Sequence, residues 1–599
     1  MIVFLTAFFL TRGRGLAAVE RFLAMFILAI AQITGTLLLA GTILHLRAGW
    51  LLALHVILLA AAYLWTGLSP APGRDAWPRP DASWRHNFWA RFLLFLAGLE
   101  TAWLIFLGYL FPPYAWDSLY YHLTAAATWL QAGRIVLSPY TIWANVYPMN
   151  TELIFTWIML LGGSDLLVDL AQLPFALAGG LAVYALARQV GLKQASSTVA
   201  AGLFFLTPIV LVQSKTCYVD VAFAGMFLAA YYFAYRYHQQ PRRAYLLLAA
   251  LGGGLTLGIK ASAAPFVAVI FVFLLAGGWQ ASRQTNRPFW PYLGFILATF
   301  TAALLLFGSF WYLRNWLAYG NPLFPFTFSV LGHTLWPGQG TVADLVMVKN
   351  TPPELVGLST WQQLLRSWQE TGEPYTFDQR LGGFGPQWLY LELPSLAVTL
   401  GLALARRQHR PLLILLPLVL LLWLQPSPWW TRYTIFIVGA GALSLAYLEA
   451  GLPRFWARSL RVATLALVLI SLAGSLTHGY FPPQVVSRFL ALPPAERTFF
   501  RLAPWGDELA WVEQVPPGSR IAFTETAFPY LLFGPRLENR VYRLIATSEE
   551  DMLRQLQDTD SQYFFTRTTS AYYPWARQNP GVFRPIFTYG DYIAYRVQL

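Results

Sequence analysis

Long uninterrupted apolar runs constrain the fold of this chain more than any other feature of its sequence. Blocks such as residues 22–44, 291–313 and 462–476 reach or approach the roughly 20 residues that a helix needs to cross a bilayer. Backbone polar groups in lipid must be hydrogen-bonded within the protein, so only helices and closed barrels span membranes. Barrel strands alternate apolar and polar residues, which these runs do not. The sequence therefore predicts a polytopic α-helical membrane protein.

Charge is scarce and unevenly placed along the chain. Only 12% of the 599 residues are charged, and the net charge is +13. The whole excess lies before residue 480, in short loops between apolar blocks, whereas the remaining segment is neutral. This distribution is typical of a membrane protein with positive cytoplasmic loops and argues against a nucleic-acid partner. The single cysteine, Cys217, excludes a disulfide framework and a cysteine metal cluster.

We expect 13 membrane spans, at about residues 22–44, 50–67, 93–111, 166–187, 197–214, 219–237, 244–260, 262–277, 289–313, 393–406, 411–425, 433–449 and 460–476. With this assignment seven basic clusters share one side of the membrane, which must then be the cytoplasm. The clusters are Arg12/Arg14/Arg21, Arg74/Arg79/Arg85/Arg91, Arg188/Lys193, Arg236/Arg242/Arg243, Arg283/Arg287, Arg406/Arg407/Arg410 and Arg454/Arg458/Arg461. The N-terminus is then cytoplasmic, and the first span is expected to be an uncleaved anchor.

Three regions follow from this topology. Residues 1–90 form an N-terminal helical hairpin and a cytoplasmic loop, and residues 91–477 form the transmembrane core with outer loops 112–165 and 314–393. Residues 478–599 contain short β-rich runs, a helical run at 548–556 and Pro/Gly turns. This last region is predicted to be a small α/β domain outside the cytoplasm.

Two acidic residues near the outer membrane surface are candidates for chemistry, because carboxylates there are costly. Asp117 follows the third span in a Pro- and aromatic-rich stretch, and Asp220 lies at the turn before the sixth span. Either residue could instead cap the helix that follows it, and Asp220 could pair with Lys215.

Three basic residues also lie at the predicted outer side. Lys260 lies between two apolar runs. Arg314 and Arg432 lie at the outer ends of their predicted spans, close to tryptophans. Cations in such positions could bind a lipid-linked phosphate. The alternative is that the long side chains reach to the membrane interface without a ligand.

Several short motifs occur in order over more than 300 residues. They are Trp116-Asp117-Ser118-Leu119-Tyr120-Tyr121-His122-Leu123, Trp129-Leu130-Gln131-Ala132-Gly133-Arg134, Tyr147-Pro148-Met149-Asn150-Thr151-Glu152-Leu153, Tyr218-Val219-Asp220, Gly258-Ile259-Lys260 and Arg314-Asn315-Trp316, the last extending to Pro325. In this arrangement the chain resembles the GT-C superfamily of membrane glycosyltransferases. It looks closest to bacterial relatives of protein O-mannosyltransferases and lipid A aminoarabinose transferases, in or near glycosyltransferase family thirty-nine.

The resemblance implies a GT-C-type helical bundle with interfacial helices at about residues 118–131 and 151–161. It implies an inverting enzyme that moves a sugar from a polyprenyl-phosphate donor to a hydroxyl of a protein, lipid or glycan acceptor. The reaction would take place on the outer face of a bacterial plasma membrane. Asp117 would match the family's first-loop catalytic aspartate, and Asp220 its second-loop acid.

The chemistry of such a reaction assigns further roles. Asp117 would take the proton of the acceptor hydroxyl, and Lys260, Arg314 and Arg432 would bind the donor phosphate. Glu152, His122 and Tyr121 are candidates for orienting the acceptor. No cofactor is required, because side chains can neutralise a monophosphate, although His122 and Glu152 could join Asp117 in a divalent metal site.

One position departs from the family pattern, because Ser118 stands where the O-mannosyltransferases usually carry a second acidic residue. A protein acceptor is therefore not favoured over lipid or glycan. Two alternatives remain open at this stage. A transporter or lipid flippase would place polar residues deep in its spans, and an oligosaccharide ligase would use a pyrophosphate-linked donor.

Overall fold

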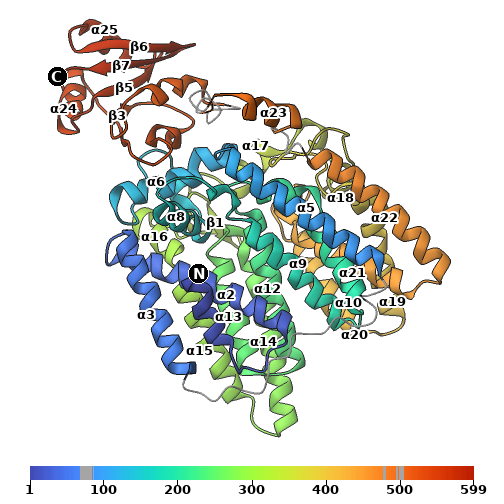
Figure 1. Ribbon diagram of the computed structural model, residues 1–599. Coiled ribbons are helices and arrows are strands. Elements are labelled where there is room, and N and C mark those ends of the chain that lie inside the picture. Colours follow the sequence, from blue (N-terminus) through green and yellow to red (C-terminus); the bar gives the residue numbers. More distant parts are fainter. Residues whose placement is uncertain (68–83, 85–86, 477–480, 494–496, 498–504) are drawn as a thin grey trace.

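The computed structural model describes residues 1–67, 84, 87–476, 481–493, 497 and 505–599 (Figure 1). The helices that build the bundle are α1 (Ile2–Thr11), α2 (Ala18–Thr42), α3 (Ala48–Gly67), α5 (Phe88–Leu110), α9 (Leu173–Gln189), α10 (Gln194–Phe205), α11 (Pro208–Ser214), α12 (Asp220–Gln239), α13 (Arg243–Leu257), α14 (Ala264–Thr285), α15 (Trp290–Phe307), α16 (Phe310–Tyr319), α19 (Leu393–Ala405), α20 (His409–Trp423), α21 (Phe436–Gly451) and α22 (Arg454–Ser475). Of the predicted cytoplasmic cluster in the first long loop, Arg74, Arg79 and Arg85 lie outside the described residues.

The chain is a helical, multi-pass membrane protein. Within the described ranges, eight helices are long and apolar enough to cross a bilayer, or nine if the bent pair α10–α11 is one span. Each of the 13 predicted spans falls on helices of the bundle, with the span at 197–214 divided between α10 and α11. Helices α13, α19, α20 and α21 are short, with 13 to 16 residues. The exact number of spans and the orientation of the termini stay predictions.

Helix α12 lies at the centre of the bundle and is buried along almost its whole length. It packs against α9, α13 and α14. Small residues permit these close approaches, as they do in other membrane bundles. A Cβ atom on Gly225 of α12 would lie only 2.2 Å from the carbonyl oxygen of Phe175 in α9. The site described below begins at the first residue of this central helix, Asp220.

Two outer segments supply further elements. The first contains the π-helix η1 (Ser118–His122) and helices α6 (Leu123–Ala132), α7 (Trp143–Val146) and α8 (Asn150–Gly162). The second contains strands β1 (Phe328–Val330) and β2 (His333–Trp336), the short helices η4 (Ala343–Met347), α17 (Val348–Asn350), η5 (Pro353–Leu355) and α18 (Thr360–Ser367), and the π-helix η6 (Trp388–Glu392). Helices η1–α6 and α8 occupy the two places where the sequence predicts interfacial helices.

The second outer segment also supports a break in the bundle. Helices α10 and α11 meet at an angle of 62°. A break in a helix leaves backbone groups without their usual partners. The backbone N–H of Ile209, in the first turn of α11, donates to the carbonyl oxygen of Gly383 at 2.9 Å. The loop before η6 therefore supplies a hydrogen-bond partner at the start of α11.

The C-terminal region contains a five-stranded sheet with the order β4-β3-β5-β7-β6, which stands at one end of the molecule beyond the helices (Figure 1). The strands are β3 (Arg520–Phe523), β4 (Arg540–Arg543), β5 (Tyr563–Arg567), β6 (Phe583–Tyr589) and β7 (Tyr592–Val597), with helices α23 (Pro483–Ala491), α24 (Glu549–Asp558) and α25 (Tyr572–Gln578) and the 3₁₀ helices η9 (Asp507–Gln514) and η10 (Pro529–Phe533). Strands β3, β5 and β7 fall on the β-rich runs of the sequence. A position outside the cytoplasm, and the division into three regions, stay predictions.

Direct hydrogen bonds attach this sheet to the first outer segment. The side-chain amide of Gln131, at the end of α6, pairs with both backbone groups of Val541 in the edge strand β4, at 2.9 and 3.0 Å. The hydroxyl of Tyr140 donates to the same carbonyl at 2.7 Å. In η10, the Tyr530 hydroxyl donates to Asp165 Oδ2 at 2.9 Å. The backbone groups at the edge of β4 thus have partners in the first outer segment, and these bonds orient the sheet relative to that segment.

Candidate active site

A cavity of about 300 Å³ lies where the two outer segments meet the ends of α12, α13 and α20. Its walls hold seven of the eight residues that the sequence singles out. These residues are Asp117, Tyr121, His122, Glu152, Asp220, Lys260 and Arg432. They come from five places in the chain: the segment from the end of α5 through η1, the first turn of α8, the first residue of α12, the loop after α13 and the 3₁₀ helix η7 (Thr431–Thr434).

Arg432 lies close to three carboxylates at the cavity. Its Nη1 lies 3.2 Å from Asp117 Oδ2 and 3.1 Å from Asp378 Oδ1, and its Nε lies 3.9 Å from Asp220 Oδ2. The guanidinium carbon is 4.2 Å from the centre of the Trp430 ring, a cation–π distance. One arginine from η7 thus joins carboxylates from three separate segments.

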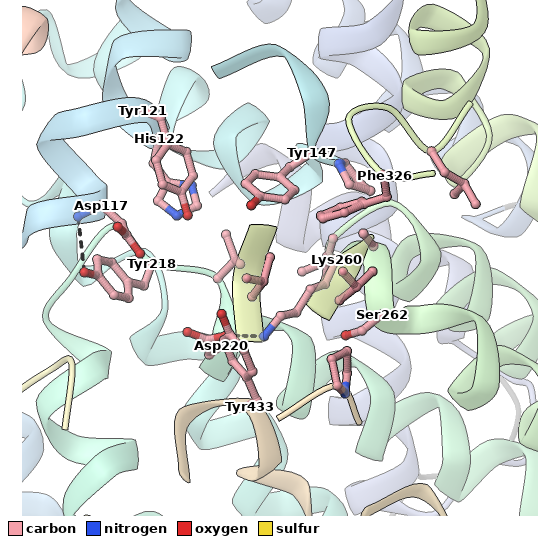
Figure 2. Close-up of a pocket in the computed structure, with 18 of the residues that line it drawn as sticks. Asp117, Tyr121, His122, Tyr147, Tyr218, Asp220, Lys260, Ser262, Phe326 and Tyr433 are labelled. Atoms are coloured by element: carbon pink, nitrogen blue, oxygen red, sulfur yellow. Dashed lines mark hydrogen bonds and ion pairs between the residues drawn. The ribbon is translucent and has the colours of Figure 1, made fainter. Parts of the chain in front are cut away.

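Asp117 stands at the N-terminus of η1 but does not cap it with its side chain. Its backbone N–H donates to the Tyr218 hydroxyl at 3.2 Å (Figure 2), while its carboxylate pairs with Arg432. The capping alternative therefore does not account for the position of this carboxylate.

Asp220 and Lys260 form a second ion pair, with Oδ1 and Nζ 2.5 Å apart (Figure 2). The Lys260 ammonium also lies 3.8 Å from the centre of the Tyr433 ring. Lys215, the alternative partner of Asp220, instead pairs with Asp169 at 2.7 Å. Lys260 therefore faces the cavity with one of its three donors engaged by a carboxylate.

His122 and Glu152 make a third polar contact, with Nδ1 and Oε1 2.6 Å apart and both side chains buried. The Tyr121 ring stacks at an angle on the His122 ring, with centroids 4.1 Å apart. Across the part of the chain that the structure describes, no three His, Cys, Asp or Glu side chains are grouped as metal ligands would be. The roles assigned to these three residues stay predictions.

Asp378 is a site residue that sequence reasoning missed. It pairs with Arg432 and with Arg380, whose Nη2 lies 3.0 Å from Asp378 Oδ2. Burial raises the pKa of Asp378, and the two guanidinium groups oppose that shift. Its sequence context, an outer loop with other acidic residues, contains no signal that separates it from them.

Arg314 is not brought together with the other candidates. Its side chain is not part of the cavity wall. Its guanidinium donates to the Tyr147 carbonyl at 3.3 Å and to the Asn315 side chain at 3.2 Å, and it packs on Trp311. Burial lowers the pKa of Arg314 to about 10. Its role as a phosphate ligand stays a prediction.

The remaining wall of the cavity is apolar. The second outer segment contributes Leu323, Phe326, Phe328, Val342 and Val346, and the Phe326 ring faces the side of Lys260 that is remote from Asp117 (Figure 2). The cavity is therefore two-sided, with ion pairs at one wall and hydrocarbon side chains at the other. Such a cavity suits an amphipathic ligand with an anionic group and an apolar chain.

Comparison with known proteins gives a family match for part of the chain. The model of the family described as dolichyl-phosphate-mannose-protein mannosyltransferase matches residues 147–307. The resemblance is thereby confirmed. The matched segment contains Glu152, Asp220 and Lys260, whereas Asp117, Asp378 and Arg432 lie outside it. No curated protein matches the chain.

Solved structures of membrane glycosyltransferases are also similar. ArnT from Cupriavidus metallidurans bound to undecaprenyl phosphate has a TM-score of 0.49 and 11% sequence identity, over 86% of this chain and 98% of that chain. The archaeal oligosaccharyltransferase AglB from Archaeoglobus fulgidus, in complex with an inhibitory peptide and a dolichol-phosphate, has a TM-score of 0.40 and 12% identity, over 86% and 75% of the two chains.

Proposed function

We propose that this protein is an inverting membrane glycosyltransferase that moves a sugar from a polyprenyl-phosphate donor to an acceptor hydroxyl at the outer face of the plasma membrane. The observation that carries the proposal is the two-sided cavity. Its charged wall suits a phosphate diester, and its apolar wall suits the adjoining isoprenoid chain. The family match adds support, since the matched family is named for a dolichyl-phosphate-linked donor.

The reaction needs one proton acceptor and a place for negative charge. The acceptor oxygen bonds to the anomeric carbon from the side opposite the phosphate, so the configuration inverts. Asp117 takes the hydroxyl proton as that bond forms. The bond between the anomeric carbon and the phosphate oxygen breaks, and the polyprenyl phosphate leaves with the electron pair. Arg432 and Lys260 stabilise the charge that grows on this oxygen.

Asp117 is suited to the role of base by its surroundings. Its carboxylate is one of three that share Arg432, and it is partly open to the cavity. Asp220 is engaged by Lys260 at 2.5 Å and is more deeply buried, so we assign it to holding that lysine.

A comparison of sugar transfer by the wild type and by the Asp117→Asn variant tests the proposal. The purified protein is supplied with a panel of short-chain polyprenyl-phosphate sugars, labelled in the sugar, and membranes that lack the protein as the source of acceptor. We expect transfer by the wild type and a loss of about 10²–10⁴-fold in D117N, as for other lost general bases.

Asp378→Asn is the matched control, because it removes a carboxylate from the same Arg432 nitrogen without removing the proposed base. We expect D378N to retain most of the turnover. Equal losses in the two variants would mean that charge balance around Arg432, and not base catalysis, explains the result. The absence of transfer with every donor of the panel would refute the proposed function.

A further inference from the structure

The C-terminal region contacts the active site through Trp505. This residue precedes η9 and belongs to neither outer segment of the core. Its indole Nε1–H donates to the carbonyl oxygen of Tyr114 at 2.8 Å. Its ring meets the Trp116 ring edge-on, with centroids 5.2 Å apart. Tyr114 and Trp116 lie three residues and one residue before Asp117, so Trp505 holds the segment that leads into the proposed base.

The Trp505 indole also contacts Phe377, the residue before Asp378. The rings of Trp505 and Phe377 are 6.4 Å apart and almost perpendicular. Phe377 in turn packs edge-on against Tyr114 at 5.5 Å and against Tyr218 at 5.4 Å. Both carboxylates that bind Arg432 Nη1 thus directly follow an aromatic residue in contact with Trp505.

Further contacts fix the indole itself. Phe528, which precedes η10, stacks with Trp505 at 6.3 Å and meets the Trp116 ring edge-on at 4.8 Å. The Trp116 ring therefore contacts two aromatic rings of the C-terminal region, which also contact each other. Aromatic pairs of this geometry contribute directional packing beyond the burial of apolar area.

We propose that Trp505 is a positioning residue of the transferase, which holds Asp117 and Asp378 in the geometry that lets both share Arg432. The inference rests on the proposed function. It gives the C-terminal region a part in the reaction that differs from covering the cavity. The sheet is attached elsewhere, by Gln131, Tyr140 and Asp165, and none of these attachments is adjacent to a carboxylate of the site.

The first test compares Trp505→Ala with Tyr530→Phe in the full-length protein. Tyr530→Phe removes only the hydroxyl that contacts Asp165 Oδ2 and Met159 Sδ, and it leaves the ring of Tyr530 in place. We expect W505A to lower kcat by about 10²-fold, which is the order of loss for a small misplacement of a catalytic group. Affinity for the short-chain donor should stay within about 2-fold, because Trp505 does not line the cavity in which the donor is expected to bind. Y530F should retain the wild-type kcat.

Trp505→Phe guards against a general failure to fold, since it keeps an aromatic ring. It removes the N–H that bonds Tyr114 together with part of the indole. We expect W505F to lose about 10-fold in kcat, between the wild type and W505A, as for one lost hydrogen bond to the loop. In the D117N background, W505A should cause little further loss, because the two substitutions act through the same group. Full additivity of the two losses would overturn the proposal, and so would equal kcat values for W505A and Y530F.

Amide hydrogen exchange provides a readout that does not depend on the reaction. We expect faster exchange in W505A for peptides that cover residues 114–122, with wild-type exchange in α12 and in the C-terminal strands. Unchanged exchange in residues 114–122 would refute the positioning role even if the protein is a transferase. Faster exchange together with no transfer by the wild type would refute the proposed function alone.

Discussion

Replacement of Arg432 by glutamine tests whether the carboxylates of the site depend on one shared cation. In the wild-type cluster three carboxylates, Asp117, Asp220 and Asp378, face three cations, Arg432, Lys260 and Arg380. R432Q keeps the carboxylates and removes the cation that joins them. We therefore expect the three carboxylates to repel one another in R432Q, whereas their attraction to Arg432 holds them together in the wild type.

The size of the effect follows from the distances and the exposure. Two unit charges 3.2 Å apart attract by about 5 kcal/mol at an effective dielectric constant of about 20, and desolvation offsets part of this. Removing one partner of a buried ion pair costs about 3–5 kcal/mol. The Arg432 side chain is 9% exposed, but those of Asp117 and Asp378 are 21% and 33% exposed, so water screens the remaining charges. We therefore expect a destabilisation near the lower end, about 3 kcal/mol.

Thermal unfolding in detergent measures this loss as a fall in Tm. The double variant R432Q/D378N removes one carboxylate as well and restores the charge balance, so its Tm should lie between those of R432Q and the wild type. Arg520→Gln serves as a control, because Arg520 pairs with Asp560 at the surface, where the two side chains are 43% and 77% exposed. Its loss should cost about 0–1 kcal/mol. A wild-type Tm for R432Q, or a lower Tm for the double variant than for R432Q, would refute the reasoning.

Two further predictions concern the donor and the membrane. Arg432→Ala and Lys260→Ala should each weaken binding of a short-chain polyprenyl-phosphate sugar by about 10–100-fold, as for a lost hydrogen bond to a charged group, whereas Arg314→Ala should weaken it less because Arg314 is not in the cavity wall. Donor affinities equal to that of the wild type in all three variants, measured by equilibrium binding, would instead indicate that these cations only reach to the membrane interface. A reporter fused after Leu599 should be extracytoplasmic and one within residues 406–410 cytoplasmic; the same location for both would contradict the predicted orientation.

The helices and most of the cavity residues could be predicted because their signals are local. An apolar run of sufficient length specifies a spanning helix wherever it stands in the chain. Asp117, Asp220, Lys260 and Arg432 are charged residues at the ends of such runs, where a charge needs a partner or a ligand. The structure brings these four residues together, although they are spread over more than 300 positions.

The rest of the site depends on contacts that no local pattern encodes. Asp378 reaches Arg432 because the loop before η6 folds back against η7, where Thr431 donates to the Gly382 carbonyl at 3.0 Å. Arg314 shows the converse. It has the same sequence signal as Arg432, an outward arginine beside tryptophan, yet its guanidinium turns to the Tyr147 carbonyl. Trp505 lies almost 400 positions from Tyr114, and its sequence context does not indicate the contact.

The hydrogen bond that the second outer segment supplies at the start of α11 also decides where this segment can change in length. Gly382, Gly383 and Gly385 all have positive φ angles, and the carbonyl of Gly383 is the partner of Ile209. One residue added there would displace the Gly383 carbonyl and break its hydrogen bond to Ile209 at the start of α11. The tip of the β1–β2 hairpin is different, because Leu331 is 95% exposed. An epitope tag inserted after Leu331 should therefore be tolerated, whereas one between Gly382 and Gly385 should not.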